Sequence, residues 1–311
     1  MRRSPGGTAP AAPAPDAPAA PRLIPAPLRF GFRGGSWELS THPRVVGILN
    51  VTPDSFHDGG RYASADRALE RAERMVEEGA DGIDVGGQST RPGAVPLGPE
   101  DEWRRVEPTL RALADRVAVP LSIDTYHGEV ARRALDLGVA VVNDISGLAH
   151  DPSIAEHAAR AGAGLVLMHA VGVPAAIHDR RDYPDVGGAV VEFLAAALEA
   201  AAARGVPRER VALDPGVGFS KQPGQSVAAL RAIPRLTALG RPVYIGVSRK
   251  SFLGALTGQP VEGRLAGTLG ATVAAYALGG RIFRAHDVRE CREALRAAVA
   301  LLTPDPPETR A

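Results

Sequence analysis

Eight times between Arg44 and Leu302, a short apolar run stops at a polar or small residue and gives way to a longer stretch of helical spacing. Apolar runs bounded in this way are typical of buried strands, and apolar residues at every third or fourth position indicate amphipathic helices. Strands that alternate with helices predict a parallel sheet. Eight such units in one chain of 311 residues favour the α/β class, as a closed (β/α)8 TIM barrel.

The competing architecture is an open doubly wound sheet, but no Gly-x-Gly-x-x-Gly sequence opens a predicted helix. Ahead of the barrel, Leu28–Phe32 and Trp37–Leu39 flank a Gly-Gly turn and predict an N-terminal β-hairpin. Residues 1–27 are rich in Ala and Pro, a composition that predicts a disordered tail. We therefore expect a single barrel domain over residues 28–302 and a second flexible tail over residues 303–311.

Composition excludes several classes of function. A net charge of +1 gives no electrostatic reason to expect a nucleic acid or a membrane surface as partner. The single cysteine, Cys291, excludes an intramolecular disulfide and fits a reducing compartment, so we expect a cytoplasmic protein. Of 36 basic residues only Lys221 and Lys250 are lysine, and Asn50 and Asn143 are the only asparagines. In a chain so biased toward arginine, these four residues are candidates for positions where their own chemistry matters.

In a closed parallel barrel all strands end at one face, where active sites are built. The polar residues expected at that face are Asn50, Asp124, Asn143, Asp144, His169, Asp214, Lys250, Arg284 and His286. Polar residues also end strands simply because strands end in water. That alternative accounts for any one of these positions much better than for the whole set.

The set suggests two kinds of binding site. Asp124, Asn143, Asp214 and Lys250 combine carboxylate, amide and ammonium groups, which suit the donor and acceptor edge of a flat heterocycle. Arg284 and His286, with Asn50 and the Ser-Thr-Arg-Pro loop at 89–92, suit an anion such as phosphate. Asn50 and Asp58 offer the hard oxygen ligands that Mg²⁺ prefers. Phe56 and Phe219, in polar loops, are candidates to contact an aromatic substrate.

Five motifs then resemble one known family. They are Asn-Val-Thr-Pro-Asp-Ser-Phe-x-Asp-Gly-Gly at 50–60, Asp-Val-Gly-Gly-x-Ser-Thr-Arg-Pro-Gly at 84–93, Leu-Asp-Pro-Gly-x-Gly-Phe at 213–219, Ser-Arg-Lys-Ser at 248–251 and Arg-x-His-Asp at 284–287. In this order they resemble the dihydropteroate synthases. The resemblance implies a (β/α)8 barrel, usually a homodimer. It also implies a transferase of folate biosynthesis that joins 4-aminobenzoate to 6-hydroxymethyl-7,8-dihydropterin diphosphate, with Mg²⁺, and that sulfonamides inhibit.

The resemblance also implies a role for each site residue. The residues implied to bind the pterin are Asp124, Asn143, Ile145, Met168, Asp214 and Lys250. Those implied to hold the diphosphate are Asn50, Thr90, Arg284 and His286, with Mg²⁺ on Asn50. Those implied to shape the aminobenzoate site are Phe56, Arg91, Pro92, Phe219 and Ser251. Diphosphate is expected to leave first, and Asp58 to lie near the cationic methylene that remains, so that Asp58, Lys250, Arg284 and His286 form the catalytic set.

The chain departs from the family pattern at two places. Gln88 stands where the family has Glu, and Val171 and Val173 replace the two amides of a Gln-Gly-Asn-Pro sequence. Two other functions compete with the synthase. A pterin-binding methyltransferase domain on the same barrel is expected to lack the Thr-Pro-Asp-Ser-Phe loop and Ser-Arg-Lys-Ser, both of which are present. A catalytically silent paralogue has no need for Asn50, Arg284 and His286 together.

Overall fold

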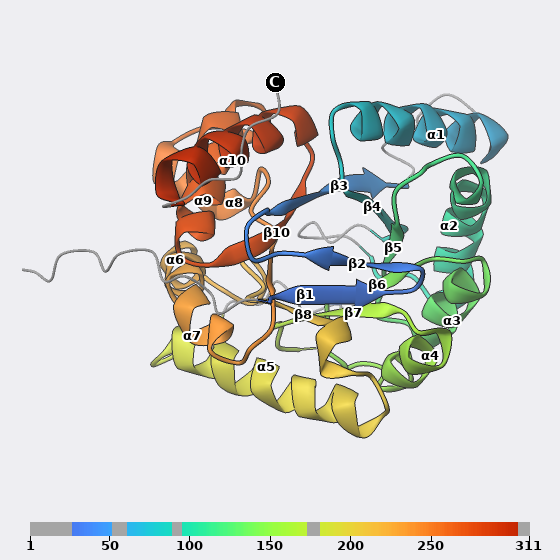
Figure 1. Cartoon of the computed structure of the whole chain (residues 1–311), viewed down its shortest axis with the longest axis horizontal. Helices are drawn as coiled ribbons and strands as arrows, with labels where there is room; N and C mark the ends of the chain where they lie inside the picture. The colour runs from blue at the N-terminus through green and yellow to red at the C-terminus, as the bar shows by residue number, and fades with distance from the viewer. Residues whose placement is uncertain (1–26, 52–60, 89–94, 173–180, 304–311) are drawn as a thin grey trace, which may run out of the picture.

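The computed structural model describes residues 27–51, 61–88, 95–172 and 181–303. Eight parallel strands close into a barrel in the order β10-β3-β4-β5-β6-β7-β8-β9 (Figure 1). They are β3 (Arg44–Asn50), β4 (Gly82–Gly86), β5 (Leu121–Asp124), β6 (Val141–Asp144), β7 (Gly164–Met168), β8 (Val211–Asp214), β9 (Val243–Ile245) and β10 (Gly280–Ala285). The predicted fold class is therefore confirmed.

Helices surround the barrel on its outer face (Figure 1). They are α1 (Arg61–Glu77), α2 (Pro99–Ala114), α3 (Gly128–Asp136), α4 (Ser153–Ala161), α5 (Val186–Ala203), α6 (Pro223–Arg231), α7 (Ile233–Thr237), α8 (Ser251–Thr257), α9 (Leu265–Ala277) and α10 (Val288–Leu302), with 3-10 turns η3 (Arg208–Arg210) and η4 (Val261–Gly263). The main core lies between strands and helices, where Val85, Val106 and Leu110 are fully buried. Cys291 lies within it on α10, as expected for a core residue.

A two-stranded hairpin, β1 (Arg29–Phe32) and β2 (Gly35–Glu38), closes the amino-terminal end of the barrel. Figure 1 shows it crossing in front of the barrel strands. Its aromatic side chains pack on residues at the strand starts, including Val141 of β6. A Cβ added at Gly164, the first residue of β7, would lie 2.8 Å from Cζ of Phe30. Glycine at this position therefore allows the Phe30 ring to fill the end of the barrel. The opposite, carboxyl-terminal end stays available for ligands.

Two local features differ from what hydrophobic spacing alone predicts. The single helix expected before Gly240 is broken into α6 and α7, because Pro234 lacks the N–H needed to continue the helix. Helix α8, after Ser-Arg-Lys, has only seven residues and too little periodicity to be recognised. The predicted tails over residues 1–27 and 303–311 lie almost wholly outside the described residues.

Helix α5 is, within the described ranges, the one helix long and apolar enough to cross a membrane by length and composition alone. It packs against the barrel, and Val190, Leu194 and Leu198 are buried there. Core helices of globular domains meet the same criterion.

Candidate active site

The centre of the site is a guanidinium held between two carboxylates from neighbouring strands. Arg284 of β10 donates from Nε to Oδ2 of Asp84 at 2.6 Å and from Nη2 to Oδ2 of Asp124 at 2.8 Å. Asn143 of β6 donates to the same Asp84 oxygen at 3.0 Å. The Asp84 side chain is fully buried, whereas those of Arg284 and Asp124 remain 19% and 15% exposed. Asp84 therefore anchors the group, and the other two side chains are left accessible to a ligand.

Electrostatic interactions keep the Arg284 guanidinium charged and, with burial, raise the pKa of one carboxyl into the neutral range. Burial alone would lower the pKa of Arg284, but the charges of Asp84 and Asp124 raise it above its ordinary value. Burial raises the pKa of Asp124 to about 7 against the pull of Arg284, and the like charge of Asp84 adds to the rise. A carboxyl with such a pKa can donate or accept a hydrogen bond near neutral pH.

Asp214 and Lys250 meet on the other side of the barrel mouth. A Cβ built on Gly246 would lie 3.7 Å from Lys250 Nζ and 3.9 Å from Asp214 Oδ2, so both groups border the same glycine. Lys250 Nζ donates to the carbonyl of Val217 and lies 4.3 Å from the centre of the Phe219 ring. Burial lowers the pKa of Lys250 to about 8, and burial raises that of Asp214, while each charge opposes the shift of the other. The predicted partners therefore come together as expected.

The loop after β10 carries His286, which is fixed by neighbouring elements. Its Nδ1 lies 2.9 Å from Oγ of Ser248, and its backbone N–H donates to the same oxygen at 3.1 Å. Arg71 of α1 donates to the His286 carbonyl at 2.9 Å. Ser248 therefore ties together the loops that follow β9 and β10.

Asn50 ends β3 close to Asp124. A Cβ added at Gly86 would lie 3.4 Å from Asn50 Oδ1 and 3.6 Å from Asp124 Oδ2. Asn50 Oδ1 and Asp124 Oδ2 are thus two hard oxygen atoms near Gly86, which has no side chain to fill the space beside them. Over the described ranges no three or more His, Cys, Asp or Glu side chains gather as a possible metal site. A divalent cation here would need oxygen ligands beyond the protein, such as substrate phosphates and water.

An apolar cluster lies beside the polar groups. It consists of Tyr126, Ile145, Met168, Ala170 and Phe219. Ile145 and Met168 were predicted to contact the faces of a pterin, and they lie together as that role requires. Phe219 was expected to have little to pack against, but it is buried in this cluster and its ring accepts the Lys250 ammonium. Polar groups beside a flat apolar wall suit an aromatic heterocycle.

Several predicted residues need separate comment. Phe56, Asp58, Thr90, Arg91 and Pro92 lie outside the described residues. Ser251 is exposed at the first position of α8, directly after Lys250. Asp144 and His169 do not face the site, because side chains alternate between the two faces of a strand. Asp144 instead accepts hydrogen bonds from Ser146 and Leu148 in its own loop.

Two residues of the site were missed from the sequence. Asp84 lies inside the buried strand Gly-Ile-Asp-Val-Gly, where a charged residue in an apolar run was the available signal. Tyr126, one turn beyond β5, carried no signal in the sequence. Its hydroxyl donates to Oε1 of Gln88 at 2.7 Å.

Gln88, one departure from the family pattern, joins a buried network. Its Nε2 donates to Oε2 of Glu102 at 2.8 Å, and its Oε1 also accepts from the N–H of Leu97 at 3.2 Å. Burial raises the pKa of Glu102 to about 7. A second carboxylate at position 88 would have to share a proton with Glu102, whereas the amide donates in either protonation state. At the other departure, Val171 exchanges backbone hydrogen bonds with the Ser220 hydroxyl, and Val173 lies outside the described residues.

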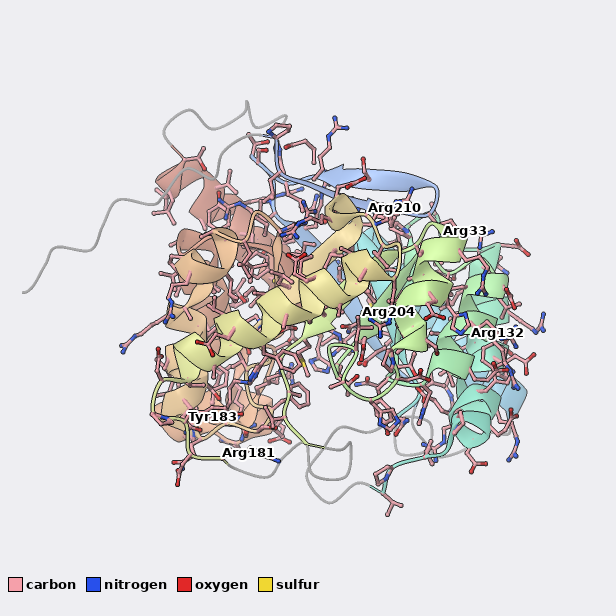
Figure 2. All side chains as sticks on the ribbon, turned by 90° about the horizontal axis from the view of Figure 1, so that it is seen from below. Arg33, Arg132, Arg181, Tyr183, Arg204 and Arg210 are labelled. Carbon is pink, nitrogen blue, oxygen red and sulfur yellow. The ribbon has the colours of Figure 1, made fainter. Side chains whose placement is uncertain are left out.

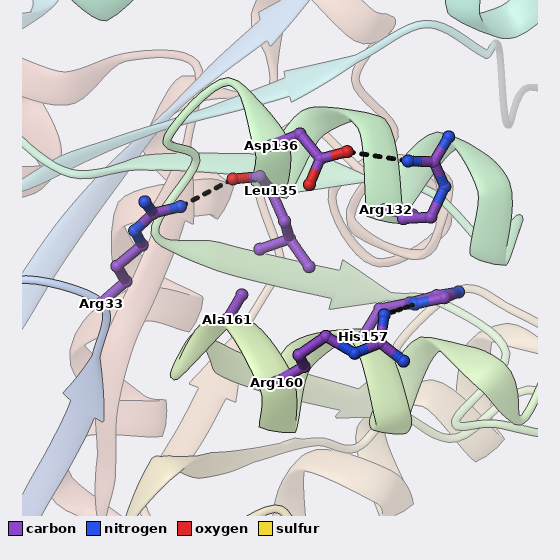
Figure 3. A pocket seen from close by; sticks show the side chains of 7 residues that line it. All are labelled: Arg33, Arg132, Leu135, Asp136, His157, Arg160 and Ala161. Carbon is purple, nitrogen blue, oxygen red and sulfur yellow. Dashed lines mark hydrogen bonds and ion pairs between the residues drawn. The ribbon is translucent and has the colours of Figure 1, made fainter.

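A cavity of about 350 Å³ lies elsewhere, between α3 and α4 (Figure 3). In Figure 2, Arg33 marks the hairpin end of the molecule, and Arg181 and Tyr183 mark the opposite end. Arg33 donates to the carbonyl of Leu135 near the end of α3, and Arg132 donates to Asp136 (Figure 3). The Arg33 guanidinium thus stabilises the carboxyl end of α3, and that of Arg132 pairs with a carboxylate on the same helix.

Comparisons with known proteins identify the family. The family model described as "Pterin binding enzyme" matches residues 46–286. The dihydropteroate synthase of Synechocystis is 42% identical over 279 residues, which cover 89% of this chain and 96% of the relative.

Solved structures give the same result. Xanthomonas albilineans dihydropteroate synthase with 4-aminobenzoic acid has a TM-score of 0.81 and 39% identity, covering 92% of this chain and 100% of that one. The Yersinia pestis enzyme in a sulfonamide drug complex has a TM-score of 0.81 and 38% identity, covering 88% and 99%. The predicted resemblance is confirmed, and the chain belongs to the dihydropteroate synthases within the family of pterin-binding enzymes.

Proposed function

We propose that this barrel releases diphosphate before the new carbon–nitrogen bond forms, as it condenses 6-hydroxymethyl-7,8-dihydropterin diphosphate with 4-aminobenzoate to 7,8-dihydropteroate. In this dissociative route the electron pair of the carbon–oxygen bond leaves with diphosphate. The pterin methylene becomes a resonance-stabilised cation, and the amine nitrogen of aminobenzoate then attacks it. The observation that carries the proposal is Arg284, fixed between Asp84 and Asp124 beside Asn50.

The pterin would lie between the polar and apolar halves of the site. Asp124, Asn143, Asp214 and Lys250 lie at the ends of β5, β6 and β8 and in the loop after β9, and would bond the heterocycle edge. Ile145 and Met168 would contact its faces. Because Asp124 titrates near neutrality, it can match either a donor or an acceptor on the ring.

The departing anion would be held by Asn50, Thr90, Arg284 and His286. Arg284 stays protonated between its two carboxylates, and Ser248 holds the imidazole of His286 in place. Preorganised positive groups stabilise a charge that develops as the bond breaks. The side-chain oxygen of Asn50, Oδ1, suits Mg²⁺ as one hard ligand. The cation would neutralise the charge of phosphate oxygens there.

Aminobenzoate would enter beside the cationic methylene. Phe219 and Ser251 flank Lys250, so all three lie within reach of one aromatic carboxylate. Phe56, Arg91 and Pro92 would complete this subsite, and the Asp58 carboxylate would stabilise the cation. Since sulfonamides resemble aminobenzoate, we expect them to compete at the same place.

The assembly and location proposed are a homodimer in the cytoplasm. Exposed apolar residues on α8 and η4, Leu256 and Val261, lie next to α9, whose outer positions are small. Contiguous exposed apolar surface of this kind marks interaction sites. A single buried cysteine suits a reducing compartment.

Diphosphate release from purified protein tests the proposal. With Mg²⁺ and the pterin diphosphate alone, the dissociative route should release diphosphate before 4-aminobenzoate is added, whereas direct displacement would release it only with both substrates. A methyltransferase-like barrel or a silent paralogue would bind the pterin without releasing diphosphate, and that result would refute the proposed route. Asp214→Asn should weaken pterin binding, and Ser251→Ala should weaken aminobenzoate binding more than pterin binding. Equal effects on both ligands would contradict the proposed division of the site.

A further inference from the structure

The second of the two lysines in the chain, Lys221, is buried directly behind the site. Its side chain is only 6% exposed, in the loop that follows β8. Its Nζ lies 2.8 Å from His169 Nδ1, 3.0 Å from the Gly216 carbonyl, 3.1 Å from the Phe219 carbonyl and 3.3 Å from the His169 carbonyl. Four acceptors thus surround one ammonium group.

The His169 ring must act as an acceptor in this arrangement. Burial and the nearby Lys221 charge lower the pKa of His169 to about 3, so the imidazole is neutral at physiological pH. Burial lowers the pKa of Lys221 to about 7, so at pH 6 the lysine is protonated and His169 Nδ1 accepts a hydrogen bond from it. The compact ammonium suits this closed space, whereas a planar guanidinium with five donors does not fit it. This requirement explains a lysine in a chain where 34 of 36 basic residues are arginine.

Lys221 Nζ and its four acceptors form what we call the Lys221 cage. This cage goes with an unusual backbone conformation in the loop between β8 and α6. Gly216, Gly218 and Ser220 have φ angles of 65°, 82° and 51°, and this left-handed conformation is unusual for serine. A Cβ at Gly216 would lie only 1.9 Å from the His169 carbonyl oxygen, so β7 and this loop are in direct contact. Carbonyl groups from both segments point at the same ammonium. Without the ammonium, the His169 and Phe219 carbonyls would lose this donor in a buried space, while the Gly216 carbonyl would keep only the Phe219 N–H.

The same loop contacts Lys250. The carbonyl of Val217 accepts from Lys250 Nζ, and the Phe219 ring lies beneath that ammonium at 4.3 Å. Val217 and Phe219 flank Gly218, in the segment that the Lys221 cage closes. Any change in the cage therefore moves the two groups that hold Lys250.

We propose that Lys221 is a positioning residue, whose caged ammonium shapes the β8–α6 loop so that Val217 and Phe219 hold Lys250 in the substrate site. The effect on catalysis rests on the roles proposed above for Lys250 and Phe219, but the structural coupling between the two lysines does not. Asp214 at the end of β8, His169 directly after β7 and Lys250 from the β9–α8 loop are the titratable groups that face Lys221.

Because the chain contains only two lysines, [¹⁵N]lysine labelling gives two side-chain signals, and each can be followed by NMR without substrate. Lys221→Met keeps the length of the side chain and removes the charge. The matched control is Arg281→Met, since Arg281 is another buried cation that donates to backbone carbonyls, those of Tyr276 and Gly280, at the far end of β10. At pH 6 we expect Lys221→Met to remove one signal and shift that of Lys250. Arg281→Met should leave both unchanged.

Kinetics provide the second measurement. In Lys221→Met, kcat/KM for 4-aminobenzoate should fall at least about tenfold, a change of about 1.4 kcal/mol, while Arg281→Met keeps the wild-type value. If Lys221→Met does not fold, His169→Leu removes one acceptor and should still shift both lysine signals, with a two- to tenfold (about one hydrogen bond) loss of kcat/KM. An unmoved Lys250 signal in either variant overturns the proposal. A wild-type protein that releases no diphosphate would instead refute the proposed function and leave the NMR result standing.

Discussion

At the scale of single residues, the site depends on how one buried carboxylate orients a cation. Asp84 receives both the Arg284 guanidinium and the Asn143 amide on one oxygen. Asp84→Asn removes a negative charge while it keeps the size of the side chain, so Arg284 loses part of its anchor. We expect kcat/KM for the pterin diphosphate to fall by about a hundredfold, equivalent to about 3 kcal/mol. Steady-state kinetics measure this.

The matched control is Asp81→Asn at the opposite end of the barrel. Asp81 likewise joins two arginines, Arg44 at 2.8 Å and Arg292 at 2.7 Å. Its replacement should lower the free energy of unfolding and leave kcat/KM unchanged. Equal kinetic losses in the two variants would mean that Asp84 acts only through stability.

A second residue, Glu102, makes stability depend on pH. Its pKa is about 7 in the folded protein, above the ordinary value of 4.5, because the carboxyl is fully buried. The folded chain therefore binds a proton that the unfolded chain has lost. The stability from this group is complete below pH 4.5 and is lost as the pH rises through 7.

Glu102→Gln removes this titration and keeps an acceptor for the Gln88 amide. Relative to the variant, wild type should lose up to about 3 kcal/mol of unfolding free energy between pH 4 and 8. Denaturant titrations of both proteins across this range measure the difference. A constant difference would show that folding does not raise the pKa of Glu102.

At the scale of elements, the sequence predicted all eight strands and the hairpin, because hydrophobic spacing and glycine positions are local signals. It predicted less well where tertiary contacts decide. The short helix α8 packs against α6 and α9. The break between helices α6 and α7 follows instead from Pro234, a local signal that was overlooked. The sequence also did not predict which side chain at a strand end faces the site. Asn143 faces the site, whereas Asp144 accepts hydrogen bonds within its own loop. Convergence of Asp124, Asp214, Lys250 and Arg284 followed once the barrel was inferred, whereas the roles of Asp84 and Tyr126 required the packed structure.

The hairpin supplies a prediction at this scale. Phe30 is 1% exposed and packs between Phe32, Trp37 and the start of β7. Phe30→Ala should lower the free energy of unfolding by about 3–5 kcal/mol, because the ring leaves a cavity that the closed barrel cannot fill. Since the hairpin covers the end opposite the site, both KM values should stay unchanged. Unfolding curves and kinetics on the same preparation test this, and a changed KM would contradict the separation of the two ends.

At the scale of the whole molecule, the proposed homodimer places α9 at the contact between two barrels. The exposed positions of this helix, Ala266, Gly270 and Ala274, recur every four residues and leave a surface that another helix can approach closely. Exposed Leu256 and Val261 extend the same surface from α8 and η4. In Figure 1 these elements lie at the upper left and α5 at the bottom, and α6, which contacts both α5 and α8, lies between them.

Ala274→Arg tests this surface, because a long charged side chain on it would have to be buried without a partner in the dimer. We expect wild type to have the mass of two chains by light scattering and Ala274→Arg to have the mass of one at micromolar concentration. Ala196→Arg makes the same change at an exposed alanine of α5 and should remain dimeric. If Ala274→Arg stays dimeric while Ala196→Arg does not, the contact lies on the α5 side. Each barrel buries its core and the apolar cluster of its site within one chain, so a dissociated chain should stay folded. Circular dichroism of both variants checks that a lower mass reflects dissociation and not unfolding.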